Sequence, residues 1–216
     1  YSVQWAEYAG SLCLMAHYPE EDFVAFSYPI GGDEEAALEA LARYAKAQGI
    51  PIIFCPASQT DTQKITSRWP AAVIEPQRRW YDYLYAAQDL RELAGRKYGG
   101  QRNHINRFID AHPDWTAEPI GPENLDECRA MAADWYDRQE DHPDKDFTLE
   151  KRALRRAFDA FSELQMDGLA IRTGGRIVAL TMGNRINDRF FDVNFEKAIL
   201  EAAYPAINRA FARYLR

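Results

Sequence analysis

Three observations predict that this sequence adopts an α+β fold built from two successive halves. Short apolar runs typical of strands alternate with amphipathic helical patterns along the whole chain. In both halves, strand-like runs follow one another across short polar turns, which favours mixed, mostly antiparallel sheets flanked by helices. The chain has 216 residues, of which 47% are hydrophobic, enough for one large domain or two small ones.

The first half reads β-β-α-β-α-β. Residues 11–16 and 23–28 are apolar runs separated by a polar turn, as in a hairpin. Asp33 is placed to cap a helix that ends at Gly49. The remaining expected elements are a buried strand, a weaker helix and an aromatic-rich strand, at residues 51–54, 61–69 and 80–85. An aromatic strand of this kind is more often core than a surface that stacks bases.

The second half reads β-α-α-β-β-β-α. Strands at residues 168–173 and 177–183 are joined by Gly174-Gly175, a dipeptide that suits a tight hairpin turn. The other expected elements are strands at residues 115–119 and 189–195 and helices at residues 122–139, 148–165 and 204–215.

Between these halves lies a basic segment, residues 95–108 (GRKYGGQRNHINRF), which opens with Arg96 and Lys97. Residues 101–111 have a helical pattern with apolar residues on one side. The other side carries Arg102, Asn103, Asn106 and Arg107. Carboxylates and phosphates are the natural partners of arginine forks set beside amides. An ordinary solvated polar face would give the same pattern and is the more common case.

Composition narrows the classes of protein to consider. A net charge of −7 and a pI near 5.2 argue against a protein that coats nucleic acid or anionic membrane through its overall field, although a local basic patch could still bind either. Three widely separated cysteines without metal-ligand spacing favour a reduced, intracellular compartment. No apolar run is long enough to span a bilayer. Tyr1 is not an initiator methionine, and the helical pattern of residues 206–216 ends without a cap, so we expect a segment of a longer chain.

The order of elements resembles a known fold. A strand, two helices, a three-stranded meander and a helix are the leading part of the Gcn5-related N-acetyltransferase fold. The first half is similar to the trailing part of the same fold. This resemblance implies tandem acyltransferase-like domains, trimmed at both outer ends, with an N-terminal half at residues 1–94, a basic linking helix at residues 95–113 and an incomplete C-terminal half at residues 114–216.

Three stretches, RKY followed by RNHINRF, FEKA and YPAIN, resemble the bacterial family of the phosphatidylglycerol lysyltransferase C-terminal domain, which is related to the Fem peptidyltransferases. The resemblance implies transfer of an aminoacyl group from charged tRNA to an amine or hydroxyl acceptor, in the best-known members a phospholipid. The connection between FEKA and YPAIN, residues 199–203, is shorter than is usual in that family.

The segment at residues 197–205 bears on the donor. Acetyl-CoA-dependent members of the fold need a glycine-containing loop that lets backbone N–H groups approach the pyrophosphate. This segment has no glycine and places Glu201 where phosphate would sit. The tRNA-dependent relatives also lack the loop, so we expect no cofactor. A CoA-dependent N-acyltransferase is the alternative enzyme, and a non-catalytic module that binds an anionic ligand is the alternative outside catalysis.

Glu196 is the candidate catalytic base. Acyl transfer needs a base for the proton of the nucleophile and donors for the oxyanion. Strand alternation places Glu196 on one face with Asn194, and with Asp192 below them. Lys197 and Asn208 could hold a carbonyl or phosphate. Equally, Glu196 could simply pair with Lys197 or with an arginine of residues 102–107, and Asn208 could be a structural amide.

The expected partners follow from this hypothesis. The basic segment would receive aminoacyl-tRNA or another anionic donor, and a phospholipid headgroup is a candidate acceptor. We expect a cytoplasmic protein, with peripheral contact at the inner membrane face as an option. The acidic loop around His142 resembles a metal-ligand cluster by composition, but consecutive acids are more often solvated, so no metal is expected. The sequence does not indicate the oligomeric state.

Overall fold

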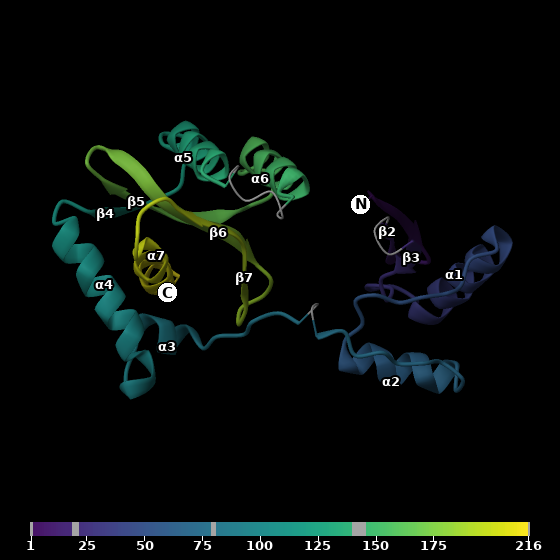
Figure 1. Ribbon diagram of the computed structural model, residues 1–216. Coiled ribbons are helices and arrows are strands. Elements are labelled where there is room, and N and C mark those ends of the chain that lie inside the picture. The colour runs from purple at the N-terminus through teal and green to yellow at the C-terminus, as the bar shows by residue number, and fades with distance from the viewer. Residues whose placement is uncertain (1, 19–21, 79–80, 140–145, 216) are drawn as a thin grey trace. The chain divides into compact units, whose positions relative to one another are not determined.

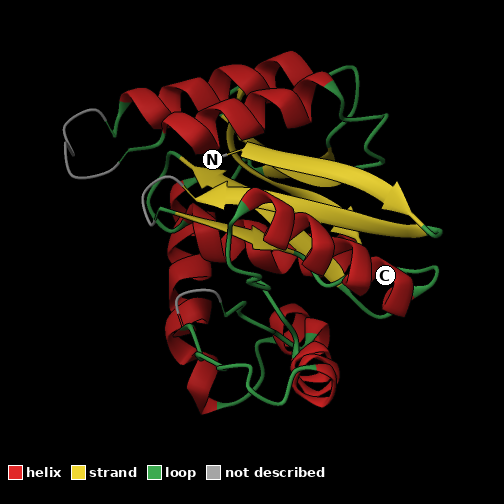
Figure 2. Cartoon of the chain, turned by 90° about the vertical axis from the view of Figure 1, so that its right-hand side faces the viewer, coloured by secondary structure: helices red, strands yellow, loops and turns green. Residues whose placement is uncertain are grey.

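A computed structural model describes residues 2–18, 22–78, 81–139 and 146–215. The chain forms two compact units, unit 1 (Tyr1–Tyr83) and unit 2 (Leu84–Arg216). Each unit has its own antiparallel sheet flanked by helices, so the predicted α+β class is confirmed (Figures 1 and 2). The division into units falls at residues 83/84, and the helix expected to link the halves lies within unit 2.

Unit 1 has a sheet of order β1-β2-β3, and its described residues include the helices α1 and α2. The hairpin of β2 (Ser11–Tyr18) and β3 (Phe23–Phe26) is as predicted, whereas β1 (Ser2–Tyr8), which pairs with β2, is an additional strand. Every residue of β1 is exposed, and this strand was not predicted from the sequence, although Val3 and Trp5 alternate with polar residues.

The helices of unit 1 follow their caps. Asp33 accepts a hydrogen bond from the backbone N–H of Ala36 at 3.0 Å at the start of α1 (Glu34–Gln48). Gly49 ends the helix with φ 67°, a conformation that glycine adopts without strain. Helix α2 (Gln59–Arg68) occupies the predicted place, and its N-cap Ser58 forms a capping box with Asp61.

Two predicted strands of the first half are not formed. The run at residues 51–54 makes only an isolated parallel bridge, between Phe54 and Phe26. The described residues of 80–85 have no regular structure, and Tyr83 and Leu84 are 86% and 79% exposed. Aromatic residues favour a strand only where they pack against neighbouring strands, and none of the described strands pairs with this run. The prediction of an aromatic core strand is therefore wrong.

Unit 2 has a four-stranded sheet of order β4-β5-β6-β7, in which every neighbouring pair is antiparallel. The β5–β6 hairpin turns at Gly174 and Gly175, as predicted. The strands are β4 (Thr116–Pro119), β5 (Asp167–Thr173), β6 (Arg176–Arg185) and β7 (Phe191–Ala198). The helices are α3 (Ala87–Glu92), α4 (Gly99–Ala111), α5 (Leu125–Asp137), α6 (Thr148–Asp159) and α7 (Ala203–Tyr214), with a short 3-10 helix, η2 (Arg96–Tyr98), before α4.

Helices cover both faces of this sheet (Figure 1). Helices α5 and α6 pack on one face, where Leu180 of β6 is buried among them. Helix α7 packs on the other face with α4 beside it, against Val178 and Ala179 of β6. Because β6 is buried on both faces over most of its length, the sheet is the centre of the unit.

A β-bulge in β7 changes the faces that its residues occupy. Met182 pairs with Phe195 and Gly183 with Val193, so Asn194 is the extra residue. Gly183 permits this close approach, since a Cβ there would lie 1.8 Å from the carbonyl oxygen of Asp192. The extra residue reverses the alternation, so Glu196 faces away from Asp192 and Asn194, which contact each other; the prediction that all three share a face is wrong for Glu196.

Candidate functional site

Glu196 lies near the end of β7, the edge strand of the unit 2 sheet. It pairs across the ladder with Thr181 of β6. From α7, Nδ2 of Asn208 donates to Oε1 of Glu196 at 3.0 Å and to the carbonyl oxygen of Tyr204 at 3.1 Å. Two strands and the helix that covers them therefore meet at one carboxyl.

Helix α7 brings Asn208 to this place because its apolar stripe fixes its rotation. Ala206, Ile207 and Phe211 are buried against the sheet. Asn208 follows Ile207 by about 100° around the helix, so it borders the packed face and reaches the edge strand. The sequence predicted Glu196 and Asn208 as site residues, and the structure brings the two together.

Burial gives the Glu196 carboxyl an altered acidity. Desolvation raises its pKa to about 7, against smaller lowering effects from the Asn208 amide, the Lys197 charge and the Thr181 hydroxyl. At neutral pH such a carboxyl is present in both its protonated and ionised forms. It can therefore accept a proton and return it, which is the behaviour of a general base that later acts as an acid.

Thr181 is a site residue that the sequence does not reveal, because it reads as one more position in an apolar strand. Its side chain is fully buried, and its hydroxyl has no hydrogen-bond partner of ordinary geometry among the described residues. Buried hydroxyls are usually paired, so this one, beside Glu196, is a donor available to the carboxyl.

Lys197 lies on the opposite face of the sheet from Glu196. Its Nζ is 2.6 Å from Oε1 of Glu150 and 4.0 Å from the centre of the Trp135 ring. The hydroxyl of Tyr136 donates to the same Glu150 oxygen at 2.7 Å. Because this ammonium is buried and already paired, its placement does not favour the predicted role in holding a carbonyl or phosphate. Lys197 also forms no ion pair with Glu196, so the alternative in which Glu196 simply pairs with Lys197 is not supported.

Asn194 is exposed at the bulge, and its Nδ2 donates to Oδ2 of Asp192 at 2.9 Å. The structure therefore leaves Asn194 apart from the Glu196–Asn208 pair. Its predicted role in substrate binding stays a prediction.

Helix α4 has the predicted two-sided character. Ile105 and Phe108 are buried against α7 and the sheet, while Asn103 and Asn106 are exposed. Arg102 is half-buried, and its Nη1 donates to the carbonyl oxygens of Leu93 and of Gly95, the latter at 2.8 Å.

Two of the other cations of the basic segment form ion pairs with carboxylates, and one does not. Nζ of Lys97 is 3.0 Å from Oδ2 of Asp89, and Nη2 of Arg107 is 2.7 Å from Oε1 of Glu201, just before α7. Arg96 is exposed and forms no ion pair with the described residues. Thus the predicted donor site is only in part a free cationic surface.

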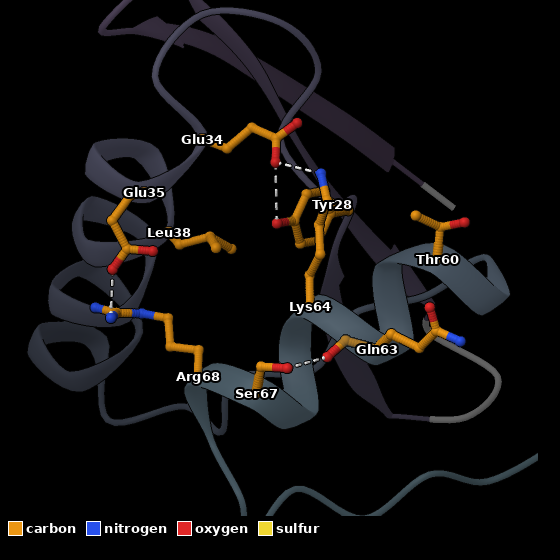
Figure 3. A pocket seen from close by; sticks show the side chains of 9 residues that line it. All are labelled: Tyr28, Glu34, Glu35, Leu38, Thr60, Gln63, Lys64, Ser67 and Arg68. Carbon is orange, nitrogen blue, oxygen red and sulfur yellow. Dashed lines mark hydrogen bonds and ion pairs between the residues drawn. The ribbon is translucent and has the colours of Figure 1, made fainter.

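A pocket of about 570 Å³ opens between α1 and α2 of unit 1 (Figure 3). Its charged side chains form two ion pairs across the pocket, Lys64 with Glu34 at 2.5 Å and Arg68 with Glu35. The hydroxyl of Tyr28 donates to Glu34 at 3.2 Å. Since these charges neutralise each other and join the two helices, we assign the pocket a structural role.

The described part of the chain contains no helix long and apolar enough to cross a bilayer. Within the same residues, His, Cys, Asp and Glu side chains form no group of three or more that could hold a metal ion. The acidic loop around His142 lies outside the described residues.

The fold and the site together define a class, an α+β domain with a half-buried carboxyl at a sheet edge that is able to exchange protons near neutral pH. The sequence matches the family described as "Phosphatidylglycerol lysyltransferase, C-terminal" over residues 1–216, and the chain belongs to that family. No curated protein matches significantly.

Two solved structures are similar to the chain. A conserved protein of unknown function from Bacteroides thetaiotaomicron VPI-5482 is 30% identical with a TM-score of 0.90, over 99% of this chain and 73% of that one. The C-terminal domain of a protein assigned as a lysylphosphatidylglycerol synthetase from Agrobacterium fabrum is 13% identical with a TM-score of 0.59, over 99% of this chain and 66% of that one. The second likeness shows the fold alone.

Proposed function

We propose that this chain is an aminoacyltransferase domain that moves an aminoacyl group from charged tRNA to a phospholipid headgroup or another hydroxyl or amine acceptor. Its membership of the phosphatidylglycerol lysyltransferase C-terminal family supports the reaction class. The single observation that carries the proposal is Glu196, a carboxyl whose pKa burial raises to about 7 at an accessible sheet edge.

In this proposal Glu196 is the general base. It takes the proton of the acceptor hydroxyl or amine as that oxygen or nitrogen attacks the ester carbonyl of the donor. The tetrahedral intermediate then expels the ribose oxygen of the tRNA, which receives the proton back from Glu196. The N–H group of the Asn208 amide donates to the Glu196 carboxyl and orients it. The side-chain oxygen of Asn208 stays free to accept a hydrogen bond from the nucleophile.

The fold supports the tandem acyltransferase-like part of the proposal. Unit 2 runs β4-α5-α6-β5-β6-β7-α7, the order of the leading part of that fold. Unit 1 has a hairpin, α1, a parallel bridge between Phe26 and Phe54, and α2, the order of its trailing part. The same proposal includes a division of the chain at residues 1–94, 95–113 and 114–216. It also includes a cytoplasmic location and contact with the inner membrane face.

The CoA-dependent alternative is less well supported. The turn before α7 carries Glu201, which forms an ion pair with Arg107 where a pyrophosphate would need backbone donors. Saturable heat of CoA binding by the full-length protein in calorimetry would favour this alternative over tRNA-dependent transfer.

The proposed reaction is tested with full-length protein, tRNAs charged with labelled amino acids and a lipid extract from the source cells. Label is expected in the organic phase, and Glu196→Gln should lower its rate of appearance by about 100-fold or more. Asp192→Asn is the matched control, since it makes the same change at an exposed carboxylate of the same strand, away from the Glu196–Asn208 pair. No transfer to lipid would exclude the phospholipid as acceptor, and equal transfer by the Glu196 variant would contradict the role of Glu196 as base.

A further inference from the structure

Four arginines of unit 2, Arg91, Arg102, Arg209 and Arg213, lie together where α3, α4 and α7 meet. None of them forms an ion pair with a carboxylate of the described residues. Other arginines of this unit do so, as Arg172 does with Glu118 at 2.9 Å and with Glu127 at 2.7 Å. In an acidic protein, cations gathered without acids need an explanation.

One carbonyl oxygen holds two of these charges together. The Nε atoms of Arg209 and Arg213 donate to the oxygen of Arg91 at 3.2 Å and 3.3 Å, so they are no more than about 6.5 Å apart. Arg91 in turn donates to the carbonyl oxygens of Ala212 and Leu215 at 2.6 Å and 2.7 Å. The guanidinium groups are therefore fixed in place by the backbone.

Helix capping alone would account for part of this arrangement. Carbonyl groups at helix C-termini attract cations, and the oxygens of Arg91, Ala212 and Leu215 lie at the ends of α3 and α7. Capping uses only the Nε atoms of Arg209 and Arg213. Their terminal nitrogens, four N–H donors on each guanidinium, have no acceptor among the described residues.

The electrostatic environment of Arg209 favours an anion as its partner. Burial first, and then the neighbouring charges of Arg213 and Arg102, lower its pKa. The opposite holds for Arg172, whose pKa is raised by its hydrogen bonds to Glu127 and Glu118. An anion between the arginines would remove their mutual repulsion and supply acceptors for the open donors.

We propose that Arg209 and Arg213, with Arg102 beside them, bind successive phosphate groups of an RNA backbone. The inference rests on the proposed function, because it assigns the place of the donor's phosphates. Arg209 directly follows Asn208, so one helix would hold both the partner of Glu196 and the first phosphate contact. The three guanidinium groups are held at fixed places beside a helix junction, which suits one polyanionic strand better than a flat lipid surface read by flexible cations.

This site differs from the one predicted on the exposed side of α4. There Lys97 and Arg107 are paired with acids, whereas Arg102 turns toward α7. In the sequence, the only sign of this site is the pair Arg209 and Arg213, one helical turn apart. The pair could not be recognised as a site because the residues beside it, Arg91 and Arg102, come from two other helices.

The test is the binding of uncharged tRNA to the full-length protein by fluorescence anisotropy at several salt concentrations. Arg209→Gln/Arg213→Gln should raise the Kd at least about tenfold and reduce the slope of log K against log salt by about 1.5 to 2, the loss of two phosphate contacts. Arg152→Gln/Arg155→Gln, on the exposed side of α6, is the control with equal loss of charge and should stay within about twofold of wild type.

Three outcomes would overturn the inference: equal weakening by both glutamine variants, wild-type binding by the Arg209/Arg213 variant, or loss of binding to phosphatidylglycerol vesicles with tRNA binding intact. If the glutamine variant fails to fold, Arg209→Lys/Arg213→Lys keeps the charges and should retain tRNA binding within about fivefold. Glu196→Gln should bind tRNA normally, so failure of the transfer chemistry is distinguishable from failure of this site.

Discussion

The raised pKa of Glu196 predicts a particular dependence of stability on pH. In the unfolded chain this carboxyl titrates with a pKa of about 4.3, and in the folded chain burial raises the pKa to about 7. Between these values the folded state binds more protons than the unfolded state, so stability falls as pH rises through this window. At about 1.4 kcal/mol per pKa unit, the ionised carboxylate costs the fold about 3 to 4 kcal/mol above pH 7.

Glu196→Gln removes this cost and keeps an acceptor for the Asn208 amide. The variant should therefore unfold like wild type near pH 4, and above pH 7 it should be more stable by up to about 3 kcal/mol. Hydrogen exchange at the amides of β6, measured from acid to alkaline pH, reports the free energy of opening unit 2 in both proteins.

Glu118 supplies a control of opposite sign in the same sheet. Its hydrogen bond with Arg172 lowers its pKa, so this group stabilises the fold at pH values above its unfolded pKa and loses that effect as pH falls. Glu118→Gln should then reduce stability near pH 7 and have less effect in acid. If Glu196→Gln is less stable than wild type at pH 8, or if both variants show the same slope with pH, the assigned burial of Glu196 is refuted.

Two further changes test the packing that positions the site. Gly183→Ala would place a Cβ 1.8 Å from the carbonyl oxygen of Asp192, so we expect the free energy of unfolding in urea to fall by about 3 kcal/mol or more. Gly100→Ala is the control, because a Cβ there meets nothing within 4 Å, and it should be neutral or slightly stabilising. Lys197→Met leaves Glu150 without its cation and should cost about 3 kcal/mol, most of which Lys197→Met/Glu150→Gln should recover; equal loss in the double variant would refute the pairing.

The sequence predicted those elements whose signals are local. Helix α1 has its capping Asp33 and its terminal Gly49, and the β5–β6 hairpin has Gly174-Gly175, so neighbouring residues suffice to define them. Strand β1 was missed because it is held by its pairing with β2 and buries no face of its own. The run at residues 80–85 was misread because β-propensity takes effect only beside a partner strand.

The candidate site was predictable only in part, because its geometry depends on contacts between segments that are distant in the sequence. Glu196 and Asn208 could be named from the resemblance and from their residue types. Their hydrogen bond depends on the rotation of α7, and the opposite orientation of Lys197 places its ammonium against Glu150 on the other side of the sheet. The bulge at Asn194 follows from a contact between two strands, which no single stretch of sequence records.

The most direct test of the central claim is the pH profile of aminoacyl transfer from charged tRNA, measured as a single-turnover rate between about pH 5.5 and 8.5. If Glu196 is the base, the rate should rise about tenfold per pH unit at acid pH, level off above a pKa of about 7, and be lost in Glu196→Gln at every pH. A rate that does not change across this range, or that the variant retains, would contradict the assignment.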